Sequence, residues 1–272
     1  MRRFTLPLVI LGSIAIAALL TWVALSSTTF GNRASRPETA SGRNEPTVTR
    51  ALPPFTRLDV SGAADLILVQ GPAESVTLPA QLRKREHLTA EVRGDTLYIE
   101  SGDRSRWWDW MVGLDGGRTS QVTVTFRDLQ AIAAAGTVKL TATAIKVADL
   151  KIAAAGGTQV KIDDLQAGQL RLSGAGALKA ELAGRVADQT VSISGAGDYR
   201  GARLVSQNAT VTVAGAAKVV VNAEKTLHAT ISGAGMVEYL GDPEVTERVS
   251  GAGRVRRRDA SGTGVARIVI AQ

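Results

Sequence analysis

The sequence predicts an all-β protein: a β-solenoid, similar to a parallel β-helix, with coils of about 20 residues, preceded by one N-terminal transmembrane or signal helix. Three observations predict it. A motif of small residues recurs at a nearly constant interval, apolar and polar residues alternate on both sides of that motif, and one long uncharged run stands near the N-terminus. A repeat this short cannot bury its own apolar row, so each coil is expected to be stable only when stacked on its neighbours.

Residues 1–30 are predicted to be a signal peptide or a membrane anchor. Arg2 and Arg3 precede an uncharged run whose most apolar part, residues 6–25, would span ~30 Å as a helix, the thickness of a bilayer core. The positive start favours a cytoplasmic N-terminus. The run is longer than the usual apolar region of a signal peptide, yet residues 24–26 (Ala-Leu-Ser) suit a cleavage site, so anchoring and cleavage both remain open.

Residues 31–50 are predicted to be a flexible polar linker, because they are rich in Asn, Ser, Arg, Thr and Pro and have no apolar period. Residues 51–272 are predicted to form the solenoid domain, with its regular repeats in residues 129–258. The domain is expected in the cell envelope, either in the periplasm on an inner-membrane anchor or exported after cleavage.

The regular repeat is built on Ser-Gly-Ala-Gly and close variants of it. The fourth residue of the motif falls at positions 136, 156, 176, 197, 217, 235 and 253, which are 18 to 21 residues apart. Four positions earlier every copy has an aliphatic residue, namely Ile132, Ile152, Leu172, Ile193, Val213, Ile231 and Val249. Apolar and polar residues alternate before and after the motif, and this period of two predicts strands with one face inside and one face in water.

The motif itself is predicted to form a tight corner in every coil. Stacking would place identical corner positions in columns ~4.8 Å apart, so the corner residues must be small. Glycine also supplies backbone angles that other residues avoid. We expect the corner alanines to be packed as well, so that Leu at Ala175 or Ala196 would clash with the coils on either side.

The two ends of the array are predicted to be less regular. The segment Ser61-Gly62-Ala63-Ala64 is predicted to be an earlier copy of the corner in the same register, within larger coils that occupy residues 51–128. Gly94-Asp95 is predicted to be a tight turn between two of their strands. Gln130 and Glu247 stand at inner positions that are apolar in the other coils, as expected where a stack ends.

These features resemble the head GIN domain family of auto-transporter adhesins. The resemblance rests on Phe55, on residues 58–66 (LDVSGAADL), on Gln70-Gly71, on the repeated Ser-Gly-Ala-Gly motif and on Gly241-Asp242-Pro243, and it covers roughly residues 52–258. It implies a bacterial envelope protein with a β-helical fold. It carries over no catalytic residue, cofactor or ligand.

Nothing in the sequence indicates catalytic, cofactor or metal chemistry. The glycine motif is followed by strands, whereas a phosphate-binding glycine loop requires a helix, so no nucleotide site is predicted. No nucleic-acid partner is predicted either. His87 and His228 are the only histidines, and the chain has no cysteine, so no metal site is predicted. The candidate acids for a glycan-cleaving enzyme fall at different positions of their coils and are interpreted as turn residues: Asp149, Asp163, Asp164, Asp188 and Asp198.

An outward column of mainly basic residues is the first candidate contact surface. The position three residues after each motif is Lys139, Gln159, Lys179, Arg200, Val220, Glu238 and Arg256. Its cations, Lys139, Lys179, Arg200 and Arg256, could follow an anionic polymer such as lipopolysaccharide or an acidic glycan, and the net charge of +7 favours such partners weakly. An ordinary solvated face is the alternative.

A tryptophan-rich insertion is the second candidate. Trp107, Trp108 and Trp110 lie close to Arg104 and Arg106, between two predicted strands. Tryptophan beside arginine suits contact with a glycan, a protein partner or a lipid interface. A flap that covers one open end of the solenoid is the alternative.

The function expected from these observations is a non-catalytic cell-envelope interaction protein, a predicted adhesin, that presents a rigid solenoid outside the cytoplasmic membrane. Its partner is expected to be an envelope glycan, a lipid or an envelope protein, and residues 6–25 are expected to contact the membrane. The alternative is a periplasmic protein that binds or acts on carbohydrate or lipid with the same scaffold.

Overall fold

The computed structural model describes residues 47–79, 88–101 and 121–258, and within these ranges the chain forms strands and turns without a helix. The all-β prediction is therefore confirmed. The predicted N-terminal helix and residues 6–25 lie outside the described ranges, and no helix able to cross a membrane occurs within them. The strands are β1 (Thr47–Ala51), β2 (Arg57–Gln70), β3 (Ser75–Pro79), β4 (Leu88–Arg93), β5 (Thr96–Ser101), β6 (Gln121–Phe126), β7 (Ala131–Gly233), β8 (Met236–Leu240), β9 (Glu244–Ser250) and β10 (Arg254–Arg257).

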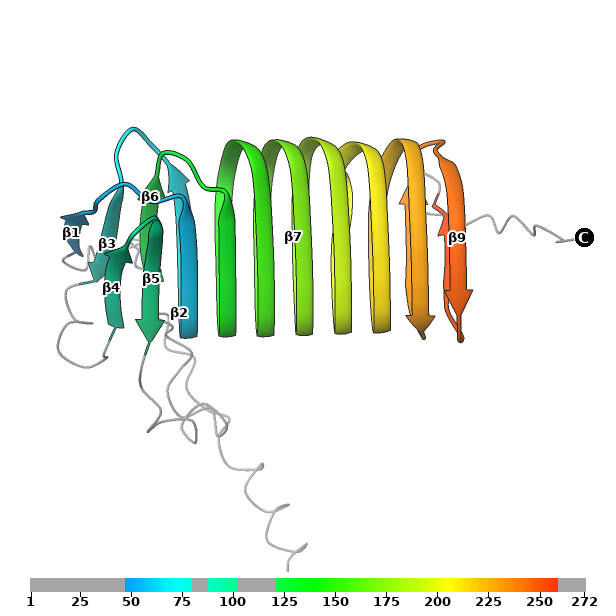
Figure 1. The fold of residues 1–272 in the computed structure, drawn as a ribbon, viewed down its shortest axis with the longest axis horizontal. Coiled ribbons are helices and arrows are strands. Elements are labelled where there is room, and N and C mark those ends of the chain that lie inside the picture. The colour runs from blue at the N-terminus through cyan, green and yellow to red at the C-terminus, as the bar shows by residue number, and fades with distance from the viewer. Residues whose placement is uncertain (1–46, 80–87, 102–120, 259–272) are drawn as a thin grey trace, which may run out of the picture. The chain divides into compact units, whose positions relative to one another are not determined.

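The longest strand, β7, winds through successive turns that lie side by side, as Figure 1 shows. Pairing with the neighbouring turn continues around each corner, as Gly62 opposite Gly136 shows, so the strand has no break. β2 pairs in parallel with the first turn of β7, from Arg57 opposite Ala131 to Leu68 opposite Ala142. β8 and β9 pair in parallel with the last turn. The sheet runs β1-β3-β6-β2-β7-β8-β10 and does not close on itself.

The segment before β7 mixes parallel and antiparallel pairing. β5 and β6 pair in parallel with β2, as expected of earlier coils, but β1, β3 and β4 pair antiparallel with their neighbours. Gly94 has a φ of 64° at the turn between β4 and β5, which confirms the predicted tight turn at Gly94-Asp95. β1 begins at Thr47, inside the segment predicted to be linker, because its residues find a partner strand in β3.

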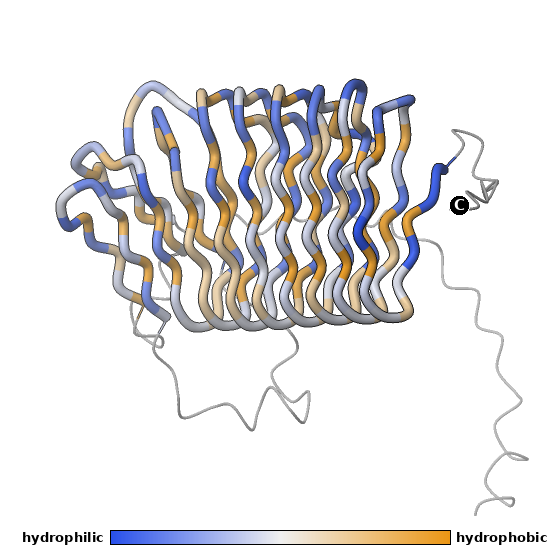
Figure 2. Tube along the Cα trace, turned by 45° about the vertical axis from the view of Figure 1, so that its right-hand side comes forward, coloured by the Kyte–Doolittle hydropathy of each residue, from blue (hydrophilic) through white to orange (hydrophobic). Residues whose placement is uncertain are grey.

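The interior is filled by the aliphatic rows that the alternation predicted, and Figure 2 shows this alternation along each turn. The aliphatic residues that stand immediately before the motif are buried from Ile132 to Ile231, each at most 1 % exposed. Val249 of the same set is 39 % exposed, because no described turn lies beyond it. Gln130 and Glu247 are exposed at the two ends of the regular array, as predicted. Low aromatic content is therefore compatible with a continuous core.

The corners stack on a column of glycines with left-handed backbone angles. The column consists of Gly62, Gly136, Gly156, Gly176, Gly195, Gly215, Gly233 and Gly251, whose φ values lie between 95° and 130°. From Gly136 onward, a Cβ atom on any of these glycines would lie 2.3 to 2.7 Å from the carbonyl oxygen of the preceding glycine in the column. Only glycine combines this φ with this close approach.

This column corrects the register that the motif predicted. In the turns at Gly136, Gly156 and Gly176 the column glycine is the fourth residue of the motif, but at Gly62 and Gly195 it is the second. The predicted alignment was therefore wrong by two residues in the upstream copy and from Gly195 onward. A shift of two keeps every side chain on the same face of its strand, so hydrophobic alternation cannot detect it.

The expected packing of the corner alanines is also wrong. Ala175 and Ala196 are both exposed on the outside of their corners. Each turn approaches the next through the glycine backbone, and the two exposed alanines are not packed into that contact. The size limit at the corner therefore applies to the glycine position.

One hydrogen-bonded group of polar side chains lies inside the otherwise apolar core. The Tyr199 hydroxyl donates to Gln189 Oε1 at 3.0 Å, the Gln189 amide donates to Ser206 Oγ at 2.7 Å, and Ser206 donates to the carbonyl oxygen of Asn222 at 2.9 Å. Tyr199, Gln189 and Ser206 are at most 1 % exposed. Burial raises the pKa of Tyr199, so its hydroxyl stays protonated as a donor.

Replacing Tyr199 by Phe is expected to lower the free energy of unfolding by about 1–3 kcal/mol, because Gln189 Oε1 would be left buried without its donor. Chemical denaturation measures this change. Tyr239→Phe is the matched control, since the Tyr239 hydroxyl makes no hydrogen bond within the described residues and its loss should change stability little. Equal effects of the two substitutions would contradict the role assigned to the Tyr199 hydroxyl.

Thr158, by contrast with the Tyr199 group, is a buried polar residue whose hydroxyl is not hydrogen-bonded to any described residue. It stands in the buried row between Val138 and Leu178 and is 3 % exposed, and its hydroxyl has no hydrogen-bond partner within the described residues. Thr158→Val keeps the shape and removes the unpaired hydroxyl, so the free energy of unfolding should rise by about 1–3 kcal/mol. Thr158→Ser, which keeps the hydroxyl and removes a methyl group, should lower it. A loss of stability in the valine variant, measured by denaturation, would show that the hydroxyl is paired.

Candidate functional site

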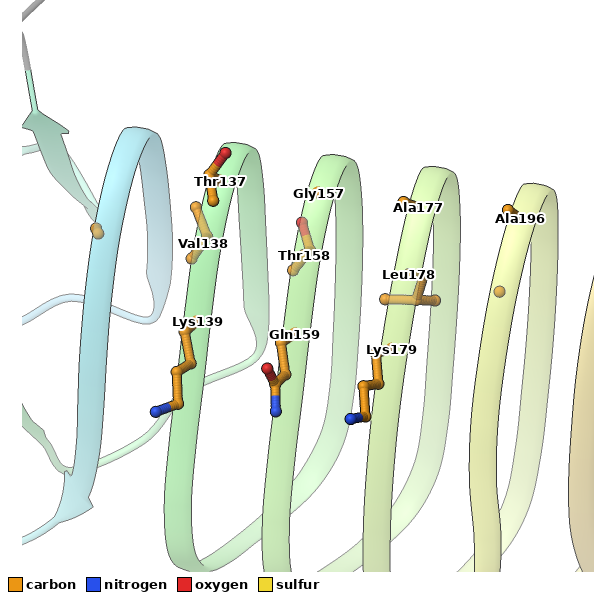
Figure 3. Close-up of a pocket in the computed structure, with 12 residues that line it drawn as sticks. Thr137, Val138, Lys139, Gly157, Thr158, Gln159, Ala177, Leu178, Lys179 and Ala196 are labelled. Carbon is orange, nitrogen blue, oxygen red and sulfur yellow. The ribbon is translucent and has the colours of Figure 1, made fainter. Parts of the chain in front are cut away.

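A shallow groove on the outer face of the first turns of β7 is the largest concentration of predicted contact residues among the described parts of the chain. Its volume is about 520 Å³. Because side chains alternate along a strand, the backbone of the buried row Val138, Thr158 and Leu178 forms its floor. Small residues line the side nearest the corner, and longer polar side chains line the other side (Figure 3).

The polar side consists of Lys139, Gln159 and Lys179, one from each of three successive turns. All three side chains point outward, and Figure 3 shows them aligned across the turns. The small side consists of Thr137, Gly157, Ala177 and Ala196. The sequence analysis did not predict these four residues as part of a site. The available signal was their position, since each directly follows a corner glycine and a small outward side chain there leaves the strand surface uncovered.

The glycine column decides which predicted cations share a row. Because Gly195 stacks on Gly176, Asp198 continues the row of Lys139, Gln159 and Lys179. Arg200 and Arg256 fall two residues further along their turns, in a neighbouring row that also contains Val220 and Glu238. The predicted single column is thus two rows, and the structure brings together only Lys139 and Lys179.

Several of these cations have an acidic partner. Lys139 Nζ lies 3.8 Å from Asp65 Oδ2, and Arg200 lies 2.7 Å from Asp198 Oδ2. Lys179 has no ion pair within the described residues. The hydrogen bond and charge of Asp198 raise the pKa of Arg200, which is already protonated at any relevant pH. The groove therefore has one free and one weakly paired ammonium group, separated by the Gln159 amide.

Arg256 has a structural partner at the C-terminal end of the array. It donates two hydrogen bonds to Glu238, whose carboxylate also lies 3.7 Å from Lys218 Nζ and 3.6 Å from Arg258 Nη1. The Glu238 side chain is 4 % exposed. Burial by itself raises the pKa of Glu238, but the hydrogen bonds and the positive charges of Arg256, Lys218 and Arg258 outweigh it, so the pKa is lowered.

Four of the five candidate carboxylates for a catalytic site contact a neighbouring polar side chain, and the pair of Asp198 with Arg200 is given above. Asp163 lies 3.4 Å from Lys161, Asp164 accepts a hydrogen bond from Gln166, and Asp188 accepts one from Asn208 on the next turn. Asp149 is exposed. His228 is exposed, and no group of three or more acidic or histidine side chains in the described ranges could hold a metal ion.

The tryptophan-rich insertion lies outside the described residues. This applies to Arg104, Arg106, Trp107, Trp108 and Trp110, and also to His87.

Comparison with known proteins connects this fold to a family and to several solved structures. Residues 54–243 match the model of a family described as "Putative auto-transporter adhesin, head GIN domain". No curated protein matches the sequence. A structure of a putative adhesin from Bacteroides fragilis is similar, with a TM-score of 0.68 and 18 % sequence identity, over 78 % of this chain and 95 % of the other.

Two further structures come from Parabacteroides. A putative lipid binding protein from Parabacteroides distasonis has a TM-score of 0.56 and 19 % identity, over 79 % of this chain and 96 % of its own. A putative adhesin from Parabacteroides merdae has a TM-score of 0.55 and 17 % identity, over the same shares. At these identities the similarity concerns the fold alone.

Proposed function

The chain belongs to the auto-transporter adhesin head GIN domain family, and from this premise we propose that it is a non-catalytic interaction protein of the cell envelope. Its β-solenoid scaffold presents a rigid outer surface outside the cytoplasmic membrane. Residues 6–25 anchor it to the inner membrane or direct its export before cleavage. The partner is an envelope glycan, a lipid or an envelope protein.

The observation that carries this proposal is that several acidic side chains of β7 pair with nearby polar side chains and do not converge on one site. Glycoside hydrolysis requires two carboxyl groups facing one substrate at about 5–10 Å. In this chain several acids of β7 pair with polar side chains of the same strand segment or of the next turn, as Asp198 pairs with Arg200 and Asp188 with Asn208. Pairs between turns, such as Asp188 with Asn208, stabilise the stacking of neighbouring strands, and carboxylates engaged in this way favour a binding surface over a hydrolytic site.

The tryptophan-rich insertion is part of the proposal as a second contact surface. Trp107, Trp108 and Trp110, with Arg104 and Arg106, offer aromatic faces and guanidinium groups suited to a sugar ring, a protein or a lipid headgroup. A carbohydrate- or lipid-active protein on the same scaffold is the alternative, and one similar structure is described as a putative lipid binding protein.

The test uses the full chain, purified in detergent, and isolated bacterial cell envelopes. Three portions of envelope are treated separately: periodate oxidises glycans, protease removes proteins, and solvent extraction removes lipids. We expect the chain to sediment with untreated envelopes, to lose this binding after one treatment, and to release no reducing sugar or fatty acid. Absence of binding would contradict the interaction proposal, and release of product would favour the enzyme. Changing the three tryptophans together to Ala tests whether the insertion contributes.

A further inference from the structure

We propose that the groove beside the first corners of β7 binds a short stretch of an acidic glycan, with Lys139 and Lys179 contacting its carboxylate groups. This inference rests on the proposed function and names the partner of that surface. Three features of the groove carry it: the position of its charges, the composition of its lining, and its open form.

The charges favour an anion in the middle of the row. Lys139 and Lys179 stand two turns apart, which is ~10 Å at the usual spacing of strands, and Gln159 stands between them. Lys179 has no acidic partner within the described residues, and Lys139 is 54 % exposed and 3.8 Å from its partner. Asp65 and Asp198 occupy the row on either side of this segment. An anionic chain would therefore be attracted over three turns and repelled beyond them.

The lining can contact both faces of a sugar residue. Thr137, Ala177 and Ala196 present methyl groups, and Gly157 leaves the floor uncovered, so the carbon-bound hydrogens of a pyranose ring could pack against this side. Gln159 makes no hydrogen bond within the described residues, so its amide is free to donate to and accept from hydroxyl groups. The ammonium groups of the lysines are placed to bind carboxylates.

The shape favours a glycan over an acyl chain. An acyl chain gains binding energy in proportion to the apolar area that it loses to the protein, which requires an enclosed cavity. This groove is shallow, and both of its sides consist of exposed residues. A sugar chain can bind there while its outer hydroxyl groups stay in water.

The test measures binding of the full chain in detergent to polygalacturonate, with fully methyl-esterified polygalacturonate as the uncharged equivalent. We expect the acid form to bind at least about tenfold more tightly, with an affinity that falls as salt is added. The double substitution K139Q/K179Q should reduce binding about tenfold. Ala177→Phe should reduce it too, by filling the groove without changing the charge.

The control is K151Q/K225Q, which removes the same charge from two exposed lysines that do not line the groove and should leave binding unchanged. Equal loss in the control, equal binding of acid and ester, or no binding of polygalacturonate would overturn the inference. The inference would also be overturned if the protein bound short-chain phosphatidylglycerol through these lysines and did not bind polygalacturonate. That result would assign the groove to a lipid. If polygalacturonate does not bind but the chain still sediments with envelopes, only this assignment fails and the proposed function stands.

Discussion

Replacing Gly176 by Ala is expected to lower the free energy of unfolding by about 2–5 kcal/mol. Gly176 has a φ of 109°, where a residue with a side chain is strained by about 1–3 kcal/mol. An added Cβ would also lie 2.7 Å from the carbonyl oxygen of Gly156, so the two turns would have to separate. Because the turns are stacked, the displacement would extend to Gly195 on the other side.

Ala175→Leu is the matched control for this prediction. The residue is adjacent in sequence, but its side chain is exposed, so the larger side chain should change stability by less than about 1 kcal/mol. Thermal and denaturant unfolding of both variants measure the difference. A stable Gly176→Ala variant, or an equally damaging Ala175→Leu, would contradict the glycine column as the contact between turns.

Replacing Glu238 by Gln is expected to cost about 2–3 kcal/mol at neutral pH. The carboxylate is buried and accepts hydrogen bonds from Arg256, while Lys218 and Arg258 lie within 4 Å. Hydrogen bonds to charged groups contribute about 1.5–3 kcal/mol, and the neutral amide would leave the three cations repelling one another. The three cations are about half exposed, and solvent screening keeps the cost below that of a fully buried ion pair.

The same carboxylate should make stability fall in acid. Its pKa in the folded protein is lowered from the ordinary value of 4.5, so around that pH the unfolded chain binds more protons than the folded one. The stabilisation is therefore complete well above pH 4.5 and is lost as the pH falls below it. Melting temperatures between pH 7 and pH 3 should show wild type and Glu238→Gln converging at the acidic end.

Asp242→Asn is the control for this pH dependence. Asp242 lies 3.1 Å from Arg257, but its side chain is 90 % exposed, and an exposed ion pair contributes little to stability. Its melting temperature should follow wild type across the whole range. Parallel curves for wild type and Glu238→Gln would show that the buried carboxylate is not the group responsible.

The sequence identified several residues of the candidate site, but it did not show which of the predicted cations lie together in one row. Lys139 and Lys179 were predicted as outward cations of one column, and the structure places them together. Arg200 and Arg256 were predicted in the same column, yet they lie in the neighbouring row and pair with Asp198 and Glu238. The small residues that open the groove, such as Ala177, give no chemical signal in a sequence that is rich in alanine.

The sequence by itself determined most of the residues that fill the interior, because alternation has a period of two and the aliphatic row from Ile132 to Ile231 is buried. Val220 and Glu238, which were predicted to face outward, are exceptions, since each is only 3 % exposed. It also determined the all-β fold, the repeat length and the position of the corners. Only the tertiary structure decided which residue of one turn meets which residue of the next. A shift of two residues conserves the inside and outside of every strand, so the hydrophobic effect does not oppose it. The choice falls to contacts between turns, where the carbonyl of Gly156 leaves room for a glycine at Gly176 and for nothing larger.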